Sequence, residues 1–434
     1  MGSHSHLGLD ARMVSSLTKQ PMHSALRVRE AVTPGERRFA GKRVAMVTFS
    51  PFPADPRPRR AVDALVAEGA SVDLICLESE NAPRREALNG VEVLRVPIKH
   101  RRGGKFEYVF RYASFILTSS AIFAMRSFAR RYDLVYVHNM PDVLVLSALI
   151  PKALGAKVVL DLHDPMPELM MTIFEKPKSS KSVQLLKRLE KWSIARADLA
   201  ITVNIACKRI FSSRSGRPEK IAVVMNSPDG QIFPFRTPHA RAAKDQIAEK
   251  KFVLMYHGSL FERNGLDVAV DALSRLRQAI PTVELRVFGA PTAFLERVME
   301  TARSKGLQDC VCFLGPRSLE GLVTEIENCD LGVIPSHRNA FTEINTPTRI
   351  FEYLTLGKPV IAPSTPGILD YFSKDSLLFF EPGDSGDLAQ QIEYAFFHPS
   401  EVLEIVRRAQ DVYREHTWEQ ERKTLLDRIS EIVP

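Results

Sequence analysis

The sequence predicts an α/β protein built from two successive domains, each with a doubly wound parallel sheet. Short apolar segments alternate with helical stretches, which is the pattern of buried parallel strands joined by helices. The alternation starts near residue 42, breaks at a polar, proline-containing segment over residues 231–251, and then resumes. The two series share their order of elements but no repeated sequence, so the similarity is architectural.

The apolar runs place the elements of the first domain. A loop over residues 50–57 is expected after the first strand, followed by a helix over residues 60–68 that stops at Gly69. Helical stretches separate most of the later strands. The expected strands cover residues 43–48, 72–76, 91–96, 134–138, 157–161, 199–203 and 221–224.

The second domain repeats this order. A strand over residues 252–256 precedes a helix over residues 267–279, and further strands are expected over residues 283–288, 311–314, 331–334 and 359–362. Residues 403–432 are expected to be helical and to cross back onto the first domain. The predicted division is a flexible tail over residues 1–40, a first domain over 41–238, a second domain over 250–415 and a bracing helix over 416–434.

Composition limits the class of protein. The 434 residues are 45% hydrophobic and 25% charged, as in an ordinary globular protein. A formal charge of +8 suits an anionic substrate or membrane surface, and no nucleic-acid-binding motif is present. The five cysteines are scattered and odd in number, which favours a reducing compartment. Without an apolar run of membrane-spanning length or a secretory signal, a cytoplasmic location is expected.

The most informative segment is FTEINTPTRIFEYLTLGKPVIAP, residues 341–363. It predicts a loop, a helix starting at Pro347 and stopping at Gly357, and a buried strand. The backbone N–H groups and positive dipole end of such a helix favour a phosphate. Glu352, about one and a half turns into the helix, can accept hydrogen bonds from two neighbouring hydroxyls, as on a ribose. Together these features suggest a nucleotide-activated substrate.

A second phosphate-binding element is expected after the strand over residues 252–256. Gly258, next to Ser259, would let the backbone approach a phosphate closely. Arg263 can neutralise a diphosphate through paired hydrogen bonds. The alternative is a turn glycine and a surface arginine.

Several motifs, in this order and spacing, resemble the retaining glycosyltransferases of family 4, which have the two-domain GT-B fold. In the second half these are HGSLFERNGLD (257–267), VCFLG (311–315) with the helix over 319–326, and the segment over 341–363. In the first half they are VHNMPD (137–142) and DLHDPMPE (161–168). VMNSPD (224–229) and HTWE (416–419) are also similar. The resemblance covers roughly residues 43 to 430.

The resemblance implies two Rossmann-like domains that face a central cleft. It also implies a reaction that moves a sugar from a nucleotide sugar to a saccharide or lipid-linked acceptor. Such a reaction would belong to polysaccharide or lipopolysaccharide assembly. It gives His163 and Glu343 the catalytic positions around the donor sugar. The expected donor-binding residues are Gly258, Ser259, Arg263, Gly289, Asn345, Thr346, Pro347, Thr348, Arg349 and Glu352. The expected acceptor-side residues are Asp55, Arg57, Arg60, His138, Asp164 and Glu168.

The chain departs from the family pattern in two places. Relatives often carry an Arg and a Lys where this chain has Ser259 and Asn264, which leaves Arg263 as the loop's cation. The family also has two glutamates separated by seven residues. Glu352 matches the second, but the first position holds Ile344, and Glu343 lies one residue too early. Glu343 either replaces the first glutamate through a loop adjustment or has another role.

No metal and no cofactor are expected. The sequence has no Asp-x-Asp motif to hold a divalent cation and no zinc-ligand spacing. The negative charge of the leaving diphosphate would then be stabilised by Arg263, Arg349 and the start of the helix.

A basic segment with interleaved aromatics, residues 98–111, precedes an apolar stretch over 112–128, and a second basic run covers 176–191. These suit association with the inner face of an anionic membrane. A solvated loop before a buried helix is the alternative. For the whole chain, a nucleotide-sugar epimerase or hydrolase and a catalytically inactive assembly partner stay open, as do the base, the sugar and the acceptor.

Overall fold

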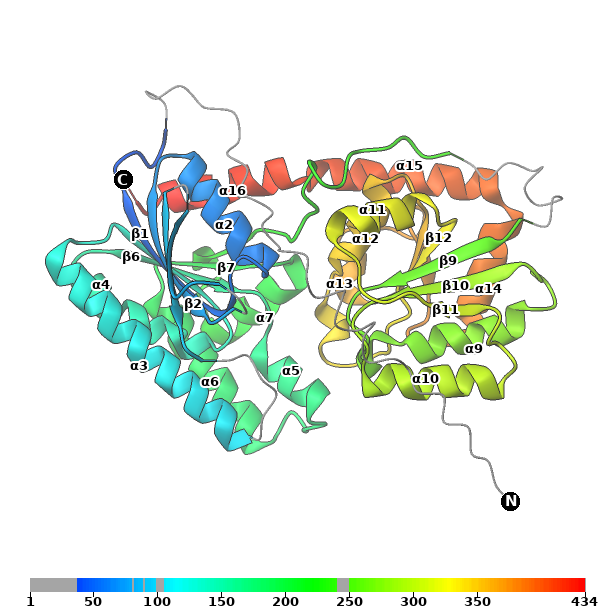
Figure 1. Cartoon of the computed structure of the whole chain (residues 1–434), viewed down its shortest axis with the longest axis horizontal. Coiled ribbons are helices and arrows are strands. Elements are labelled where there is room, and N and C mark those ends of the chain that lie inside the picture. The colour runs from blue at the N-terminus through cyan, green and yellow to red at the C-terminus, as the bar shows by residue number, and fades with distance from the viewer. Residues whose placement is uncertain (1–36, 80–81, 89, 99–104, 240–249, 434) are drawn as a thin grey trace, which may run out of the picture.

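The computed structural model describes residues 37–433 except residues 80–81, 89, 99–104 and 240–249. Most of the predicted tail, part of the first basic segment and part of the linker therefore lie outside the described residues. Two parallel-sheet domains lie side by side, and the last two helices run along both (Figure 1). Residues 37–40, which were expected to belong to the flexible tail, form a turn instead, because the Phe39 side chain is buried in the core of the first domain.

The first domain is an eight-stranded sheet in the order β3-β4-β2-β1-β5-β6-β7-β8. Every neighbouring pair is parallel except β3 and β4. The short edge strand β3 was not predicted, because its residues are half-exposed and lack a continuous apolar run. The strands are β1 (Arg43–Pro51), β2 (Ser71–Leu77), β3 (Arg85–Leu88), β4 (Val91–Val96), β5 (Leu134–His138), β6 (Lys157–Leu162), β7 (Leu199–Thr202) and β8 (Ile221–Val223).

The sheet separates two hydrophobic cores. In β5, Leu134 and Tyr136 enter one core and Val135 and Val137 the other, as strand alternation requires. One core contains α2 (Pro56–Ala67) and the C-terminal helix. Helices on the opposite face are α3 (Lys105–Ala129), η1 (Asp142–Ala148), α4 (Leu149–Ala153), α6 (Lys181–Arg196) and α7 (Ile205–Ser215), while α5 (Met166–Ile173) precedes α6 and η2 (Pro218–Lys220) precedes β8.

The second domain has a six-stranded parallel sheet in the order β11-β10-β9-β12-β13-β14. Its strands are β9 (Phe252–His257), β10 (Val283–Phe288), β11 (Val311–Phe313), β12 (Leu331–Val333), β13 (Val360–Pro363) and β14 (Leu378–Phe380). The last of these was not predicted. The helices are η3 (Glu262–Asn264), α9 (Leu266–Leu276), α10 (Ala293–Ser304), α11 (Leu319–Glu327), η4 (Thr342–Ile344), α12 (Thr348–Thr355), α13 (Pro366–Leu369) and α14 (Ser385–Phe397).

Two helices, not one, end the chain. They are α15 (Pro399–Glu415) and α16 (Trp418–Ser430), and the break falls where the Thr417 side chain caps α16. The α16 side chains of Trp418, Leu425, Leu426 and Ile429 belong to the core of the first domain. Among the described residues, no helix combines the length and apolarity that a membrane span needs.

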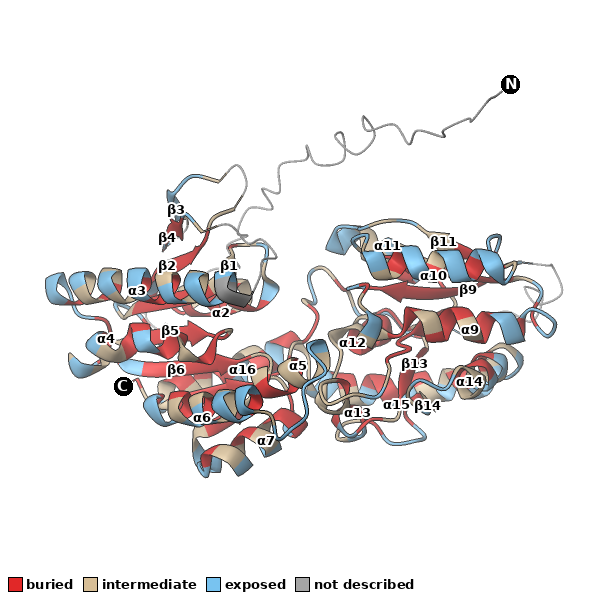
Figure 2. Cartoon of the chain, turned by 90° about the horizontal axis from the view of Figure 1, so that it is seen from below, coloured by how far each residue is buried: buried red, intermediate tan, exposed pale blue. Residues whose placement is uncertain are grey.

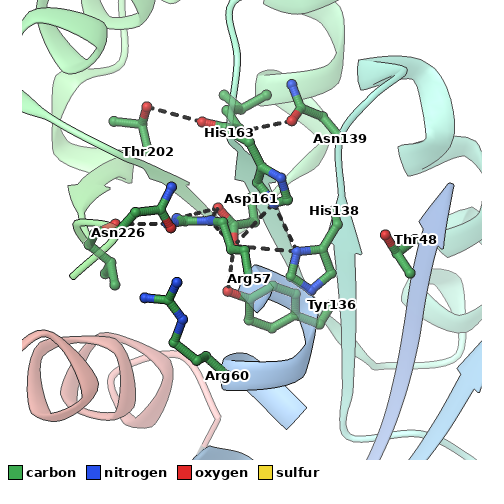
Figure 3. Close-up of polar contacts among 12 residues, drawn as sticks. Thr48, Arg57, Arg60, Tyr136, His138, Asn139, Asp161, His163, Thr202 and Asn226 are labelled. Atoms are coloured by element: carbon green, nitrogen blue, oxygen red, sulfur yellow. Dashed lines mark hydrogen bonds and ion pairs between the residues drawn. The ribbon is translucent and has the colours of Figure 1, made fainter. Parts of the chain in front are cut away.

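The helix α2 starts one turn earlier than predicted. Asp55 caps it by accepting a hydrogen bond from the backbone N–H of Arg57, and Pro56 occupies the first turn, where its missing N–H is not needed. Arg57 and Arg60 therefore lie on the first turns of a helix rather than at a loop, and they point toward the ends of β6 and β8 (Figure 3).

Candidate functional site

A buried polar network lies at the carboxyl end of β6 in the first domain (Figure 3). The Arg57 guanidinium donates to both carboxylate oxygens of Asp161, with the closest approach 2.6 Å. The same guanidinium donates to the Val224 carbonyl at 3.1 Å and to Asn226 Oδ1 at 2.9 Å, and the Tyr136 hydroxyl donates to Asp161 at 2.9 Å. These bonds join α2, β5, β6 and the segment after β8 into one rigid unit.

The charge of Asp161 is secured by its partners. Burial alone would raise the pKa of this carboxyl, but Arg57 and the neighbouring histidines outweigh burial and hold the pKa well below its usual range. Burial raises the pKa of Tyr136 well above its ordinary value, so its hydroxyl stays a donor. Asp161 is therefore ionised at any physiological pH and fixes the groups around it.

His138 and His163 form a hydrogen-bonded pair beside this carboxylate. His138 Nδ1 lies 3.0 Å from His163 Nε2 and 3.5 Å from Asp161 Oδ2. Burial lowers the pKa of His138 well below its ordinary value despite Asp161, so the ring is neutral. Its Nε2 is buried and has no partner among the described residues. We therefore assign the proton of His138 to Nδ1, because a proton on Nε2 would be buried without an acceptor.

This assignment determines the tautomer of its partner. His163 Nε2 accepts from His138, so the proton of neutral His163 lies on Nδ1, as a donor for a ligand. The His163 backbone N–H donates to Asn139 Oδ1 at 2.8 Å, and Asn139 Nδ2 in turn donates to Asp142 and to the Asp164 carbonyl. His163 is thus held at both ends, with its side chain 17% exposed.

His138, Asp161 and His163 bring three potential ligand atoms within 4.8 Å of one another. The surroundings do not fit a metal ion. Coordination through His138 Nδ1 would move its proton to the buried, partnerless Nε2, and metal-ligating histidines normally donate from their other nitrogen. Asp161 is also already saturated by Arg57 and Tyr136. The geometry instead suits a hydrogen-bond relay.

In the second domain, Glu352 and Arg349 project from α12 toward the end of β9. Glu352 Oε2 lies 3.4 Å from His257 Nε2, and Arg349 donates to the His257 carbonyl at 2.6 Å while lying over the Tyr256 ring. Burial and Arg349 lower the pKa of His257 to about 3, so this ring is neutral. Burial raises the pKa of Glu352 to about 7, although Arg349 and Arg60 oppose the shift.

Two glycines lie in the loops after β9 and β10, and one of them, Gly258, is beside Arg349. Gly258 has φ +119°, and a Cβ there would lie 3.3 Å from Arg349 Cδ. A Cβ on Gly289 would lie only 2.3 Å from the Gly258 carbonyl oxygen. The loops after β9 and β10 therefore pack backbone against backbone, which only glycine permits at these positions.

The loop with the altered family residues is closed by its own side chains. Asn264 Nδ2 and the Tyr256 hydroxyl both donate to the Ser259 carbonyl at 2.7 Å. The Arg263 guanidinium lies 4.9 Å from the Phe261 ring centre and 5.8 Å from that of Phe341. Burial lowers the pKa of Arg263, and the attraction of Asp164 in the other domain opposes this shift. Asn264 thus stabilises the loop at a position where relatives often have a lysine.

The displaced glutamate has a different environment from the one expected. Glu343 lies in η4 and forms an ion pair with Arg338, which also pairs with Glu381 at 2.9 Å. Ile344 takes the place of the family's first glutamate and packs against a core cluster of the first domain. The Ile344 carbonyl accepts from Asn204 at 2.8 Å. Ile344 thus makes an apolar contact between the domains, while Glu343 is paired with Arg338.

The start of α12 differs slightly from the prediction. Pro347 is the N-cap residue, and Thr348 is the first helical residue. Thr346 is held by a hydrogen bond from its hydroxyl to the Gly367 carbonyl at 2.7 Å, and Asn345 ends η4. The N-cap makes no side-chain hydrogen bond, so the first N–H groups of α12 are not capped by that residue.

Contacts between the domains bring the two groups of residues together. Asn339 Oδ1 accepts from the Thr172 hydroxyl at 3.1 Å, and Arg209 forms a two-bond ion pair with Asp370 at 2.7 and 2.8 Å. Arg60 of the first domain acts on the charge of Glu352 in the second. The predicted donor and acceptor sides therefore face each other.

Besides His138, four residues expected on the acceptor side have structural partners. Asp55 caps α2, and Arg57 is 8% exposed in the Asp161 network. Glu168 is 5% exposed and paired with Arg214, which also binds Glu190 at 2.9 Å. Both Glu168 oxygens are used by Arg214, so this carboxylate supports the packing of α5, α6 and α7. Arg60 also has a partner, because it donates to the Ser227 carbonyl and lies 5.4 Å from the Trp418 ring.

Sequence reasoning missed four residues of this site: Asp161, Tyr136, Asn226 and His257. Asp161 was detectable as a charged residue inside the apolar run KVVLDL, and His257 as a polar residue ending a buried strand. Tyr136 and Asn226 carried no such signal, because their roles depend on contacts between distant segments.

Comparisons with known proteins agree with this architecture. The family described as "Glycosyl transferase 4-like domain" matches residues 54–227, and "Glycosyl transferases group 1" matches residues 240–411. The probable glycosyltransferase WbjE of Pseudomonas aeruginosa is 21% identical over 248 residues, which are 56% of this chain and 60% of that protein. The D-inositol 3-phosphate glycosyltransferase of Corynebacterium diphtheriae is 26% identical over 162 residues, 35% of this chain and 36% of that protein. These matches span less than two thirds of either relative.

Solved structures share the fold over most of the chain. Sucrose-phosphate synthase from Thermosynechococcus elongatus has a TM-score of 0.70 at 17% identity, covering 90% of this chain and 99% of that one. Anabaena HepE, solved with UDP and glucose, has a TM-score of 0.65 at 19% identity, covering 90% and 100%. The predicted fold class is confirmed. Because two successive glycosyl transferase domains account for most of its length, the chain belongs to the glycosyltransferases of the two-domain GT-B type.

Proposed function

We propose that this protein transfers a sugar from a nucleoside-diphosphate sugar to an acceptor hydroxyl, with retention of anomeric configuration and without a metal ion. The observation that carries the proposal is the arrangement around α12, where Glu352 and Arg349 face Gly258 at the carboxyl edge of the second sheet. A nucleoside diphosphate needs a carboxylate to accept from its ribose hydroxyls. It also needs a guanidinium and accessible backbone N–H groups to bind its phosphates.

Each charged group has a role in the proposed reaction. Glu352 accepts hydrogen bonds from the ribose hydroxyls, while Arg349, Arg263 and the start of α12 offset the charge that grows on the leaving diphosphate. Arg60 adds a cation from the first domain. Four such groups supply, from protein alone, the electrostatic stabilisation that a divalent cation gives in other transferases.

The first domain orients the donor sugar and the acceptor. His163 donates from Nδ1 to a sugar hydroxyl, and His138 keeps that proton in place. In front-face retention the acceptor oxygen bonds to the anomeric carbon as the bond to the diphosphate oxygen breaks, on the same side. The acceptor proton passes to that departing oxygen. The proposed acceptor is a saccharide or a lipid-linked saccharide of polysaccharide or lipopolysaccharide assembly.

The test is a panel of nucleotide sugars, beginning with UDP sugars because structural relatives were solved with UDP. Nucleotide release and product anomers are measured for the natural chain and for Glu352→Ala and Arg263→Ala. We expect both variants to lose at least tenfold in kcat/KM and chelators to have no effect. Transfer that survives both substitutions unchanged would overturn the site. An isomer or free sugar formed from donor alone would favour the epimerase or hydrolase, and no nucleotide binding would favour an inactive partner.

A further inference from the structure

The outer surface of α3 is apolar although nothing in the described chain covers it. Phe110, Leu117, Met125 and Phe128 are spaced seven, eight and three residues apart, so they lie along one side of the helix. Their exposed fractions are 72%, 71%, 66% and 74%. The row extends about 27 Å along the helix axis. The opposite side of α3 is packed into the core, so the helix is apolar on both sides.

Neighbouring helices continue this surface. The helices η1 and α4 pack beside α3 and expose Leu146 and Ile150, and α6 packs beside η1 and exposes Leu185. Figure 2 shows exposed segments on α3, α4 and α6. We call this surface the outer helix face, and it consists of Phe110, Leu117, Met125, Phe128, Leu146, Ile150 and Leu185. An exposed apolar row of this length, with further exposed apolar side chains on the helices packed beside it, marks a site of interaction with a protein or a membrane.

Basic side chains border the outer helix face. Along the exposed side of α6 lie Lys181, Arg188 and Lys191, and Arg130 and Arg131 follow α3 directly. The described acids of α3 and α6 are already paired, Glu107 with Arg111 and the buried Glu190 with Arg214. A second copy docked face to face would bring like charges together, which opposes a homodimer. Apolar side chains bordered by cations suit a bilayer with anionic headgroups.

We propose that the outer helix face docks the first domain onto an anionic membrane, with α3 lying in the plane of the interface. Helices that follow parallel strands begin at the carboxyl edge of the sheet, so α3 and α6 begin on the side of the sheet where His163 follows β6. A lipid-linked acceptor then reaches this end of the domain while its lipid stays in the bilayer. The docking itself depends only on this surface and not on the proposed reaction.

The experiment is co-sedimentation of the full chain with vesicles of phosphatidylcholine alone and of phosphatidylcholine mixed with phosphatidylglycerol. We expect binding to the anionic vesicles that weakens with salt. Combining Phe110→Ser, Leu117→Ser and Phe128→Ser should weaken it more than tenfold, and combining Lys181→Gln, Arg188→Gln and Lys191→Gln about a hundredfold. The matched control combines Leu314→Ser, Leu319→Ser and Phe397→Ser, which are exposed apolar residues of the second domain.

Melting curves verify that each variant is folded, since all the substituted residues are exposed. Equal binding to both vesicle types, or a serine variant that binds like the natural chain, would overturn the proposal. A dimer that forms without lipid and is lost in the serine variant would assign the surface to a protein interface instead. Vesicle binding is measured without substrate, so its failure leaves the proposed transfer reaction untouched.

Discussion

At the scale of single residues, Glu352 shows a conflict between stability and binding. Its carboxylate is mostly buried, and burial raises its pKa to about 7 from the ordinary value of 4.5. Between pH 4.5 and about 7, the folded protein therefore keeps a proton on Glu352 that the unfolded chain has already released. Stability contributed by the neutral form is present at acid pH and is lost as pH rises through about 7. The carboxylate that is proposed to bind the ribose is thus destabilising in the free protein.

We predict that Glu352→Gln stabilises the free protein at pH 8, by up to about 3 kcal/mol, because it removes this buried charge. The gain should disappear near pH 4. Urea unfolding at both pH values measures it, with the exposed Glu393→Gln as the control. The same variant should bind nucleoside diphosphates at least tenfold more weakly. A destabilised variant at pH 8 would contradict the assigned burial.

The histidine pair gives a second prediction at this scale. We expect long-range ¹H–¹⁵N NMR at neutral pH to show a neutral His138 with its proton on Nδ1, because burial lowers its pKa well below the ordinary range. The neutral form of His163 should carry its proton on Nδ1. In His138→Leu that preference should be lost, whereas His138→Asn should keep it, since the Asn amide can donate from nearly the same point. An unchanged His163 spectrum in the leucine variant would refute the relay.

At the scale of elements, glycines decide how closely the loops of the second domain approach one another. Gly265 lies between η3 and α9 with φ +71°, and a Cβ there would fall 1.8 Å from the Pro335 carbonyl oxygen. The contact ties the start of α9 to the segment after β12. The loop that carries Arg263 therefore depends on a backbone contact that no larger residue permits.

Gly265→Ala should accordingly cost about 3 kcal/mol or more, since left-handed strain adds to a backbone clash. Gly216→Ala is the matched control, because its φ is +68° but no atom lies within 4 Å of the added Cβ. It should cost only about 1 kcal/mol from the strained conformation. Chemical denaturation of both variants measures the difference, and equal losses would show that the Pro335 contact relaxes without cost.

At the scale of the whole molecule, the C-terminal helix links the two domains. The chain leaves the second domain through α15, and α16 then completes the core of the first domain beside α2. The Glu421 carboxylate accepts from the Met225 backbone N–H at 2.8 Å, which adds a polar anchor at the same contact. The stability of the first domain therefore depends on residues about two hundred positions later in the chain than its last strand.

We expect Leu426→Ala to destabilise the first domain by about 2–5 kcal/mol, because its side chain is 1% exposed in that core. Hydrogen-exchange mass spectrometry should show faster exchange in β1 and α2 while α9 and α10 stay protected. The exposed Leu369→Ala is the control. Loss of protection confined to the second domain would contradict this role of α16.

The sequence alone determined the order of elements and the fold class, because apolar periodicity and turn residues are local properties of the chain. The strands over residues 91–96, 134–138 and 283–288 were predicted with the bounds that the structure has. Residues that follow one strand end, such as Gly258, or lie near a helix start, such as Glu352, could be assigned to a candidate site from local patterns, and the family resemblance added Arg349. The family resemblance joined these pieces into one expected cleft.

Only the tertiary structure decided which charged side chains form ion pairs or hydrogen bonds with other residues. Arg57 and Asp161 are 104 residues apart and meet because β1 and β6 both flank β5, an order that local patterns do not encode. Ile344 packs against the first domain, and the neighbouring Glu343 pairs with Arg338. The exposed apolar row of α3 likewise depends on which side of the helix the sheet covers. Partners between distant segments are set by strand order and packing, and for that reason single-sequence patterns could not supply them.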